Sequence, residues 1–419
     1  MKKRIWILNH YAGNMFFDFG GRHYAFAKYL RREGYEPVVF CSNTKHGKPE
    51  CFFQTEKLWE AHLAEEIDVP FVFVKARTYV GNGKQRFLNM VDFYRNVRKA
   101  AKEYAQVHGR PDVIYASSVH PLTLVAGIQL AKHYGVRCVC EVRDLWPESL
   151  IAYGYLKPEA IAVRMLRRLE KWTYKKADAL IFTMEGGYDY IREQGWEREI
   201  PQSKVYHINN GVDLETFQYN REHFQIHDPD LENPDTFKVV YTGSVRKANG
   251  LKELLECAAC LQEKTDIRIL VYGKGEDWST LEEMRKQRGL DNVAFKGFVQ
   301  KQAVPYILSK SSLNLLNYDV NTEKVYRFGS SQNKLFEYLA SGKPILANIP
   351  IAYDIVEANH CGVCKRLSTG EDYAREILKI KNFPPEAYRT LCNNAQSAAK
   401  QYDFKILTKR LLQVIEGNE

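Results

Sequence analysis

The sequence predicts an α/β protein with two doubly wound domains, each a parallel sheet with helices on both faces. Short apolar runs alternate with segments of helical periodicity along almost the whole chain, the pattern of open parallel sheets. At 419 residues the chain is too long for one hydrophobic core. A polar stretch with two prolines, 220–236, interrupts the alternation, which then restarts. We therefore expect two Rossmann-like domains facing a cleft, with ligands at the carboxyl ends of the strands.

The expected elements follow from periodicity. In the first half, strands are expected at 4–8, 37–41, 71–74, 113–116, 137–142, 179–183 and 205–208, with helices at 21–33, 87–108, 121–134, 158–176 and 185–194. In the second half, strands are expected at 238–242, 267–272, 293–295, 313–316 and 344–347, with helices at 250–263, 277–288, 301–309 and 333–340.

The domain boundaries follow from the polar interruption. We assign 1–215 to an N-terminal domain and 216–402 to a C-terminal domain, with 220–236 as the linker region. Two further helices, 385–400 and 403–416, end the chain. We expect this helical C-terminus to pack back across the first domain, the segment 403–419 in particular.

The net charge of +9 is unevenly distributed. Residues 1–200 carry an excess of eight positive charges and residues 201–419 an excess of one. On the expected helix 158–176, one face is basic and the other is expected to serve the core; these are Arg164, Arg168, Lys171 and Lys175 against Ile161, Leu166, Leu169 and Trp172. The basic face is either simply solvated or attracts anionic lipid headgroups or a pyrophosphate-bearing acceptor. No nucleic-acid-binding motif is present, so nucleic acid is not an expected partner.

Cysteine use and hydropathy indicate a cytoplasmic protein, peripheral at most to the inner face of the membrane. The first apolar run ends at Asn9-His10, which favours a strand over a signal peptide, and no run reaches the roughly 20 residues that span a bilayer. Nine cysteines are then expected to be reduced. The pairs Cys257/Cys260 and Cys361/Cys364 could mimic a zinc site, but the first pair lies in a helical pattern and the two pairs are far apart in sequence, so we expect no metal site. We also expect no cofactor.

The stretch 328–347 carries the strongest functional signal. A polar loop runs into a short helix that contains one carboxylate, Glu337, and stops at Gly342 before an apolar strand. A helix N-terminus suits a phosphate, and a carboxylate one turn further in could accept hydrogen bonds from a ribose diol. The alternative is an ordinary amphipathic helix with one exposed Glu.

Other loops after strands add weaker signals. Gly20 and Gly21 precede the first long helix, where backbone could approach a ligand closely. Gly243 is followed by Arg246 and Lys247, which could clamp a diphosphate. A glycine-rich turn also occurs at 272–276, and the stretch 291–298 is expected to be a strand that ends at Gly297, where backbone could read a base edge.

Taken in order, these motifs resemble a GT-B glycosyltransferase of glycosyltransferase family four. The residues that carry the resemblance are Gly20-Gly21, Glu141-Val-Arg-Asp-Leu-Trp-Pro-Glu-Ser149, Ile208-Asn-Asn-Gly-Val-Asp213, Tyr241-Thr-Gly243, Asn292-Val-Ala-Phe-Lys-Gly297 and Ser331-Gln-Asn-Lys-Leu-Phe-Glu-Tyr-Leu-Ala-Ser-Gly-Lys-Pro344. The chain is most similar to the bacterial branch that builds surface polysaccharides, such as the L-fucosamine-type transferases.

The resemblance implies roles for particular residues. Gly21 would lie near the donor β-phosphate, and Glu337 would bind the ribose diol. Arg246 and Lys247 would neutralise the diphosphate without a metal ion. Ser331, Asn333 and Lys334 would meet the donor sugar and phosphates.

The sequence departs from the family pattern at two places. Many members carry a pair of Glu residues, and the first position of that pair is Gly329 here. Many also carry a His after the strand 137–142, where this chain has Arg143 and Asp144. We expect Arg143 or Asp144 to substitute for that His. His120 is a second candidate, although a loop His is as often a hydrogen-bonded surface residue.

The resemblance implies a retaining glycosyltransferase that uses a nucleotide-sugar, UDP-linked in this branch, and a lipid-linked or oligosaccharide acceptor. Two alternatives stay open. One is a nucleotide-sugar epimerase of the same fold, with Asp144, His120 and Glu148 as acid and base. The other is a non-catalytic sugar-nucleotide-binding protein. A dinucleotide-dependent oxidoreductase is disfavoured, because no Gly-x-Gly-x-x-Gly follows the first strand.

Overall fold

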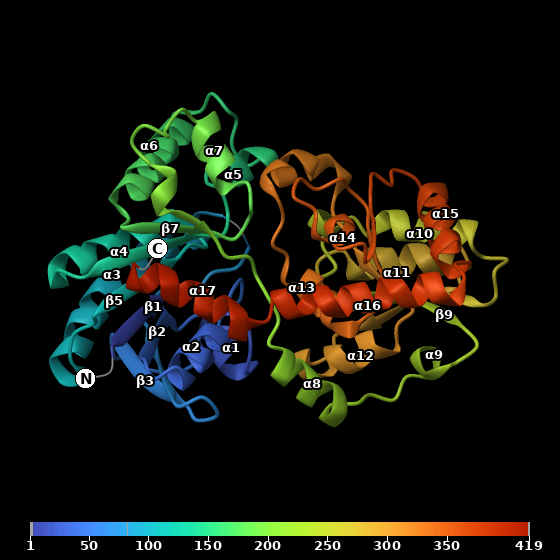
Figure 1. Ribbon diagram of the computed structural model, residues 1–419, viewed down its shortest axis with the longest axis horizontal. Coiled ribbons are helices and arrows are strands. Elements are labelled where there is room, and N and C mark those ends of the chain that lie inside the picture. Colours follow the sequence, from blue (N-terminus) through green and yellow to red (C-terminus); the bar gives the residue numbers. More distant parts are fainter. Residues whose placement is uncertain (1–2, 82, 418–419) are drawn as a thin grey trace. The chain divides into compact units, whose positions relative to one another are not determined.

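A computed structural model describes residues 3–81 and 83–417, which form two α/β units (Figure 1). The first unit runs to Asn209 and takes in the chain again from Phe404, whereas the second is Asn210–Asp403. The two-domain, doubly wound prediction is therefore confirmed.

The described part of the first unit contains an eight-stranded sheet in the order β3-β4-β2-β1-β5-β6-β7-β8. All its pairings are parallel except that of β3 with β4. Its strands are β1 (Arg4–Leu8), β2 (Glu36–Ser42), β3 (Trp59–Ala64), β4 (Val69–Val74), β5 (Val113–Ser117), β6 (Arg137–Val142), β7 (Ala179–Phe182) and β8 (Val205–His207). Its helices are α1 (Gly13–Phe17), α2 (Arg22–Arg32), α3 (Lys84–His108), α4 (Pro121–Tyr134), α5 (Glu148–Ala152), α6 (Ile161–Lys176), α7 (Gly187–Glu193) and α17 (Phe404–Glu416).

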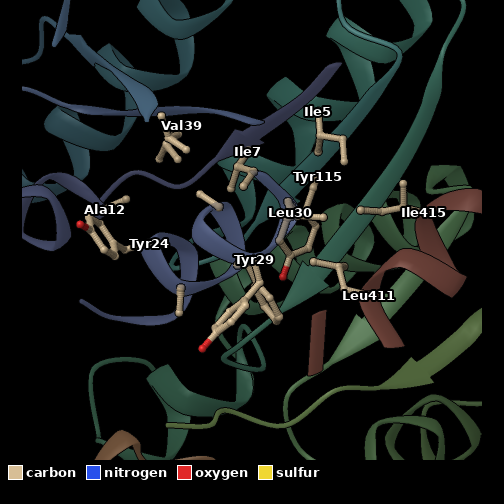
Figure 2. Packing of buried hydrophobic residues seen from close by; sticks show 14 of the residues in the cluster. Ile5, Ile7, Ala12, Tyr24, Tyr29, Leu30, Val39, Tyr115, Leu411 and Ile415 are labelled. Atoms are coloured by element: carbon tan, nitrogen blue, oxygen red, sulfur yellow. The ribbon is translucent and has the colours of Figure 1, made fainter. Parts of the chain in front are cut away.

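Alternate residues of the strands serve the two faces of this sheet. Ile5 and Ile7 of β1 pack with side chains of α2 and with Leu411 and Ile415 of α17 (Figure 2). Trp6, between them, contacts aromatic rings of α3 and α4 on the opposite face. The α17 segment, remote in sequence, thus completes the core of the first unit.

The described part of the second unit contains a parallel six-stranded sheet in the order β11-β10-β9-β12-β13-β14. Its strands are β9 (Phe237–Thr242), β10 (Ile267–Tyr272), β11 (Val293–Gly297), β12 (Leu313–Leu316), β13 (Ile345–Ala347) and β14 (Gly362–Cys364). Its helices are α8 (Leu214–His223), α9 (Pro229–Glu232), α10 (Lys252–Cys260), α11 (Trp278–Gln287), α12 (Val304–Lys310), α13 (Asn333–Ser341), α14 (Ile355–Ala358), α15 (Gly370–Lys381) and α16 (Pro385–Gln401). In the described ranges the chain also forms four 3₁₀ segments: η1 (Gln202–Lys204), η2 (Lys247–Asn249), η3 (Lys301–Ala303) and η4 (Val320–Phe328).

Three sequence-based interpretations are wrong. The stretch 220–236 is not a linker, because it holds the end of α8 and all of α9, and Leu231 is fully buried in the core of the second unit. Helix α16 does not pack across the first unit, because it packs on α13 of the second. On α6 the expected core face is misplaced, since Ile161 and Trp172 are exposed.

Candidate functional site

Predicted site residues of the first unit lie at the carboxyl edge of three neighbouring strands, β1, β5 and β6. After β1, Gly20 and Gly21 separate α1 from α2. Gly21, the residue just before α2, has a φ of 98°. A Cβ added at Gly21 would lie 3.0 Å from the Cγ of Met15. Positive φ and close packing both favour glycine at this helix N-terminus.

His120 follows β5 and is the residue before the first turn of α4. The sequence left open that His120 is a surface residue, but its side chain is only 1% exposed. Its Nε2 lies 2.6 Å from Nδ1 of His10, which follows β1. Burial lowers the pKa of His120 to about 3 and holds the pKa of His10 well below its usual value. Both rings are therefore neutral at pH 7, and one donates a hydrogen bond to the other.

Arg143 and Asp144 lie on the loop after β6, next to the loop that carries His120 because β5 and β6 pair. The backbone N–H of Arg143 donates to Oγ of Ser118 at 3.0 Å. The Asp144 side chain is exposed. The structure thus brings the three predicted catalytic residues to adjacent loops of one sheet.

An ion pair that sequence reasoning missed lies in the interior of the first unit. Nε and Nη2 of Arg22 donate to Oε2 of Glu141 at 2.8 and 2.6 Å, and both side chains are almost completely buried. Burial alone would raise the pKa of Glu141, but the Arg22 guanidinium holds it well below its usual value. Tyr115 and Ser117 also donate to this carboxylate. The available signal was a Glu inside the apolar run 137–142.

The Arg22 guanidinium also ties the end of the first unit to its sheet. Its Nη1 donates to the carbonyl oxygen of Asn209 at 2.5 Å, and its Nη2 donates to that of Ile208 at 2.9 Å. Asn209 is the last residue before the chain enters the second unit. The buried pair therefore fixes the point at which the chain leaves the first unit.

In the second unit, glycines bring loop backbones into contact at the carboxyl ends of β9 and β10. A Cβ on Gly273 would lie 1.7 Å from the carbonyl oxygen of Gly243, and one on Gly275 would lie 2.1 Å from that of Val245. Neither contact could accommodate a side chain. Gly243 itself has φ 137°. This edge is the one at which doubly wound sheets bind phosphates.

Lys334, near the start of α13, reaches this glycine edge. Its Nζ donates to the hydroxyl of Tyr241 at 2.7 Å and lies 4.2 Å from the centre of that ring. A Cβ on Gly243 would lie 2.9 Å from the same Nζ. Solvent reaches part of the side chain, yet desolvation of the ammonium group, assisted by Lys301, lowers the pKa of Lys334 to about 7.

Glu337 lies one turn beyond Lys334 on α13. Its side chain is 16% exposed, and one carboxylate oxygen lies 2.5 Å from Nζ of Lys301. Asn333, the first residue of the helix, is exposed. Gln332 precedes it without a side-chain cap, and its Oε1 is buried with no hydrogen-bond partner among the described residues.

Ser331, Arg246 and Lys247 complete the predicted donor set. Oγ of Ser331 accepts from the N–H of Asn210 at 2.9 Å, and its carbonyl oxygen accepts from Nδ2 of Asn210 at 2.5 Å. Ser331 thus holds the backbone at the start of the second unit. Arg246 and Lys247 are exposed on the loop after β9.

Gly329, where the family pattern would place a first carboxylate, has φ 100°. A Glu with this backbone would be strained, so the departure from the pattern is built into the loop. Among the described residues, no group of three or more His, Cys, Asp or Glu side chains could hold a metal ion.

Two Rossmann-like units with glycine-rich carboxyl edges define a GT-B fold. The chain belongs to the glycosyltransferases: residues 23–216 match the model for Glycosyltransferase Family 4, and residues 223–400 match the model for Glycosyl transferases group 1.

Curated relatives are similar over part of their length. The chain is 29% identical over 147 residues to a probable glycosyltransferase, WbjE, of Pseudomonas aeruginosa, which is 35% of this chain and 36% of that protein. It is 23% identical over 235 residues to a putative teichuronic acid biosynthesis glycosyltransferase, TuaH, of Bacillus subtilis, covering 53% and 55% of the two chains. The matches thus span between about a third and just over half of these relatives.

Solved structures share the fold over the whole chain. Sucrose-phosphate synthase from Thermosynechococcus elongatus superposes with a TM-score of 0.72 at 16% identity, covering 99% of each chain. Anabaena HepE in complex with UDP gives 0.65 at 14%, covering 100% of each. A putative UDP-N-acetylglucosamine 2-epimerase from Listeria monocytogenes gives 0.60 at 14%, covering 100% of this chain and 96% of that one.

Proposed function

We propose that the protein is a retaining glycosyltransferase that transfers a sugar from a UDP-linked donor to a lipid-linked or saccharide acceptor in surface polysaccharide biosynthesis. The observation that carries the proposal is the convergence of Gly243, Lys334 and Glu337 at one edge of the second sheet. It combines close backbone approach, a cation and a carboxylate, which are the groups that a nucleoside diphosphate requires. The names of the similar proteins support the UDP donor and the polysaccharide role.

The proposed donor site needs no metal ion. Lys334, Arg246 and Lys247 supply positive charge to the diphosphate as the glycosidic bond to phosphate breaks. Glu337, held by Lys301, accepts hydrogen bonds from the ribose diol. Gly20 and Gly21 offer backbone N–H groups at the start of α2.

The proposed acceptor side is the carboxyl edge of the first sheet. His120, neutral at pH 7, can accept or donate a hydrogen bond, and exposed Asp144 can orient an acceptor hydroxyl. In the retaining reaction, the departing phosphate helps to take the acceptor proton.

The enzyme acts in the cytoplasm, at the inner face of the cytoplasmic membrane where a lipid-linked acceptor would lie.

Binding of UDP tests the donor site. In calorimetric titration, Glu337→Ala should weaken UDP binding tenfold to a hundredfold, since a charge-assisted hydrogen bond is worth roughly 1.5–3 kcal/mol. Glu371→Ala, an exposed Glu of α15, is the matched control and should bind UDP as wild type does. Equal affinities for wild type and Glu337→Ala would refute the assignment.

An assay with UDP-sugars distinguishes the proposed transferase from two other functions of this fold, an epimerase and a non-catalytic binder. An epimerase is supported by the fold of the Listeria protein, but Glu148, one of its candidate groups, is engaged by Arg167. With UDP-sugars and no acceptor, an epimerase makes a new nucleotide-sugar. A transferase releases UDP slowly at most, and a non-catalytic binder gives neither product.

A further inference from the structure

The outward face of α6 carries an apolar stripe that the core does not use. Ile161, Met165 and Trp172 are 69%, 64% and 38% exposed. The inward face is formed instead by Val163, Glu170, Thr173 and Tyr174. Ile161, Met165, Arg168, Trp172 and Lys175 recur at alternating spacings of four and three residues, so they lie on one seam of the helix.

Positive charge surrounds this stripe. Between Tyr155 and Lys176 the chain has seven Lys or Arg residues and two Glu residues, of which Glu170 is buried. Glu199 pairs with Lys171 and Lys175, and Glu148 pairs with Arg167. Within the described chain, Arg164 and Arg168 take part in no ion pair.

Exposed aromatic side chains lie on the segment just before α6 and add apolar surface. Tyr153 and Tyr155, on the segment between α5 and α6, are 42% and 60% exposed. Figure 1 shows α5, α6 and α7 grouped at one end of the first unit, beyond α4, against which α6 packs. Tyrosine and tryptophan rings are favoured at the boundary between lipid headgroups and acyl chains.

We propose that α6 and the segment before it form a membrane-docking surface, in which Ile161, Met165 and Trp172 enter the headgroup region of an anionic phospholipid bilayer. Exposed apolar side chains with basic side chains among and beside them are the arrangement of helices that lie in the plane of a membrane. The basic residues provide attraction to anionic lipids, and Ile161, Met165 and Trp172 provide the apolar surface that inserts. No described helix is long and apolar enough to cross a bilayer, and this mode of attachment requires none.

The inference rests on the proposed function, because a membrane-borne acceptor gives the docking surface its purpose. None of its residues is among those proposed to bind the donor. A surface of this kind would hold the enzyme at the membrane without a lipid anchor. The strength of membrane binding would depend on ionic strength and on lipid charge.

Sedimentation with phospholipid vesicles tests the proposal. Wild type should bind vesicles containing phosphatidylglycerol at low salt, and bind pure phosphatidylcholine vesicles at least tenfold more weakly. The triple variant Ile161→Ser, Met165→Ser, Trp172→Ser should lose at least tenfold in vesicle affinity, as should the double variant Arg164→Gln, Arg168→Gln. Both variants should keep the wild-type affinity for UDP, which separates this test from that of the proposed function.

Matched controls come from α3, which also exposes an apolar residue and basic residues. Val107→Ser and the double variant Lys99→Gln, Lys102→Gln should bind vesicles as wild type does. Lipids that carry a quencher near the headgroup should quench wild-type fluorescence more than that of Trp172→Phe.

Three results would overturn the proposal. The first is that wild type does not bind anionic vesicles at low salt. The second is that the triple Ser variant binds as wild type does, since attraction would then be electrostatic without insertion. The third is that wild type forms a dimer in sedimentation velocity without lipid and the triple variant does not, since the stripe would then face a second copy.

Discussion

The titration of Lys334 provides the most direct test of the proposed phosphate site. Its pKa of about 7 leaves it protonated below that pH and neutral above it. Because a diphosphate favours the protonated form, affinity for UDP-glucose should fall as pH rises from 6 to 8.5, by up to tenfold per unit. A sugar-linked diphosphate lacks the phosphate proton that titrates near pH 6, so UDP-glucose is the better probe.

The lysine is responsible only if its removal abolishes the trend. Calorimetry should give a nearly flat profile for Lys334→Gln, whereas Lys286→Gln, on the exposed side of α11, should keep the wild-type slope. A flat wild-type profile would place Lys334 away from the phosphates.

Arg22 carries the second prediction at this scale. Arg22→Met leaves the Glu141 carboxylate buried without its partner, which typically costs about 3–5 kcal/mol. Urea unfolding should show a loss of that order in the free energy of unfolding. Arg31→Met breaks an exposed pair with Asp68 and should cost less than about 1 kcal/mol. A small loss for Arg22→Met would mean that water or another cation compensates Glu141.

Individual residues show what sequence could and could not predict. Gly243 and Lys334 were both expected at the donor site, but their contact was not, because it joins a loop and a helix 91 positions apart. The His10–His120 pair was likewise missed, since hydrogen bonding between two loops leaves no local pattern. Sequence therefore identified residue types at strand ends, whereas the fold determined their partners.

At the scale of elements, sequence patterns predicted the strands that are buried on both faces. They failed for elements that are only partly buried. Strands β1, β6, β10 and β12 have the predicted bounds, because central parallel strands are continuous apolar runs. Strand β3 was missed because it pairs at the sheet edge with one half-exposed face. On α6, Ile161 and Trp172 resembled core residues, and only packing shows that Val163 and Tyr174 fill that role.

The contact between the β9 and β10 loops leads to a prediction about these elements. Gly273→Ala should displace the Gly243 loop, because the new Cβ would overlap the carbonyl oxygen of Gly243. We expect UDP affinity to fall at least tenfold, measured by calorimetry. Gly289→Ala is the control, since Gly289 has positive φ but nothing within 4 Å of an added Cβ. It should cost only about 1–2 kcal/mol of stability and leave UDP affinity unchanged. Retained affinity in Gly273→Ala would separate this loop contact from donor binding.

At the scale of the whole molecule, the two sheets were predictable but the linker was not. The stretch 220–236 lacks periodicity because α9 is very short and the residues around it form no helix or strand. Asp228 there accepts hydrogen bonds from Tyr272 and Lys296, so polar residues with specific partners were mistaken for a solvated linker. The chain enters the second unit at Asn210, whose neighbours in sequence carry no Gly/Pro-rich or charged run.

The distribution of charge in the molecule leads to the last prediction, which concerns metal ions. Arg246, Lys247 and Lys334 lie on elements around one glycine edge, and together they could balance a diphosphate without a cation. UDP affinity and slow UDP release from a UDP-sugar should therefore be unchanged, within about twofold, in excess EDTA. The double variant Arg246→Ala, Lys247→Ala should lose at least a hundredfold in UDP affinity, since two charge-assisted hydrogen bonds are removed, and added Mg²⁺ should not restore it. Lys264→Ala with Lys286→Ala removes the same charge elsewhere in the second unit and should have no effect. If chelation abolished UDP binding and a divalent ion restored it, the phosphates would be held by a metal ion and not by these side chains.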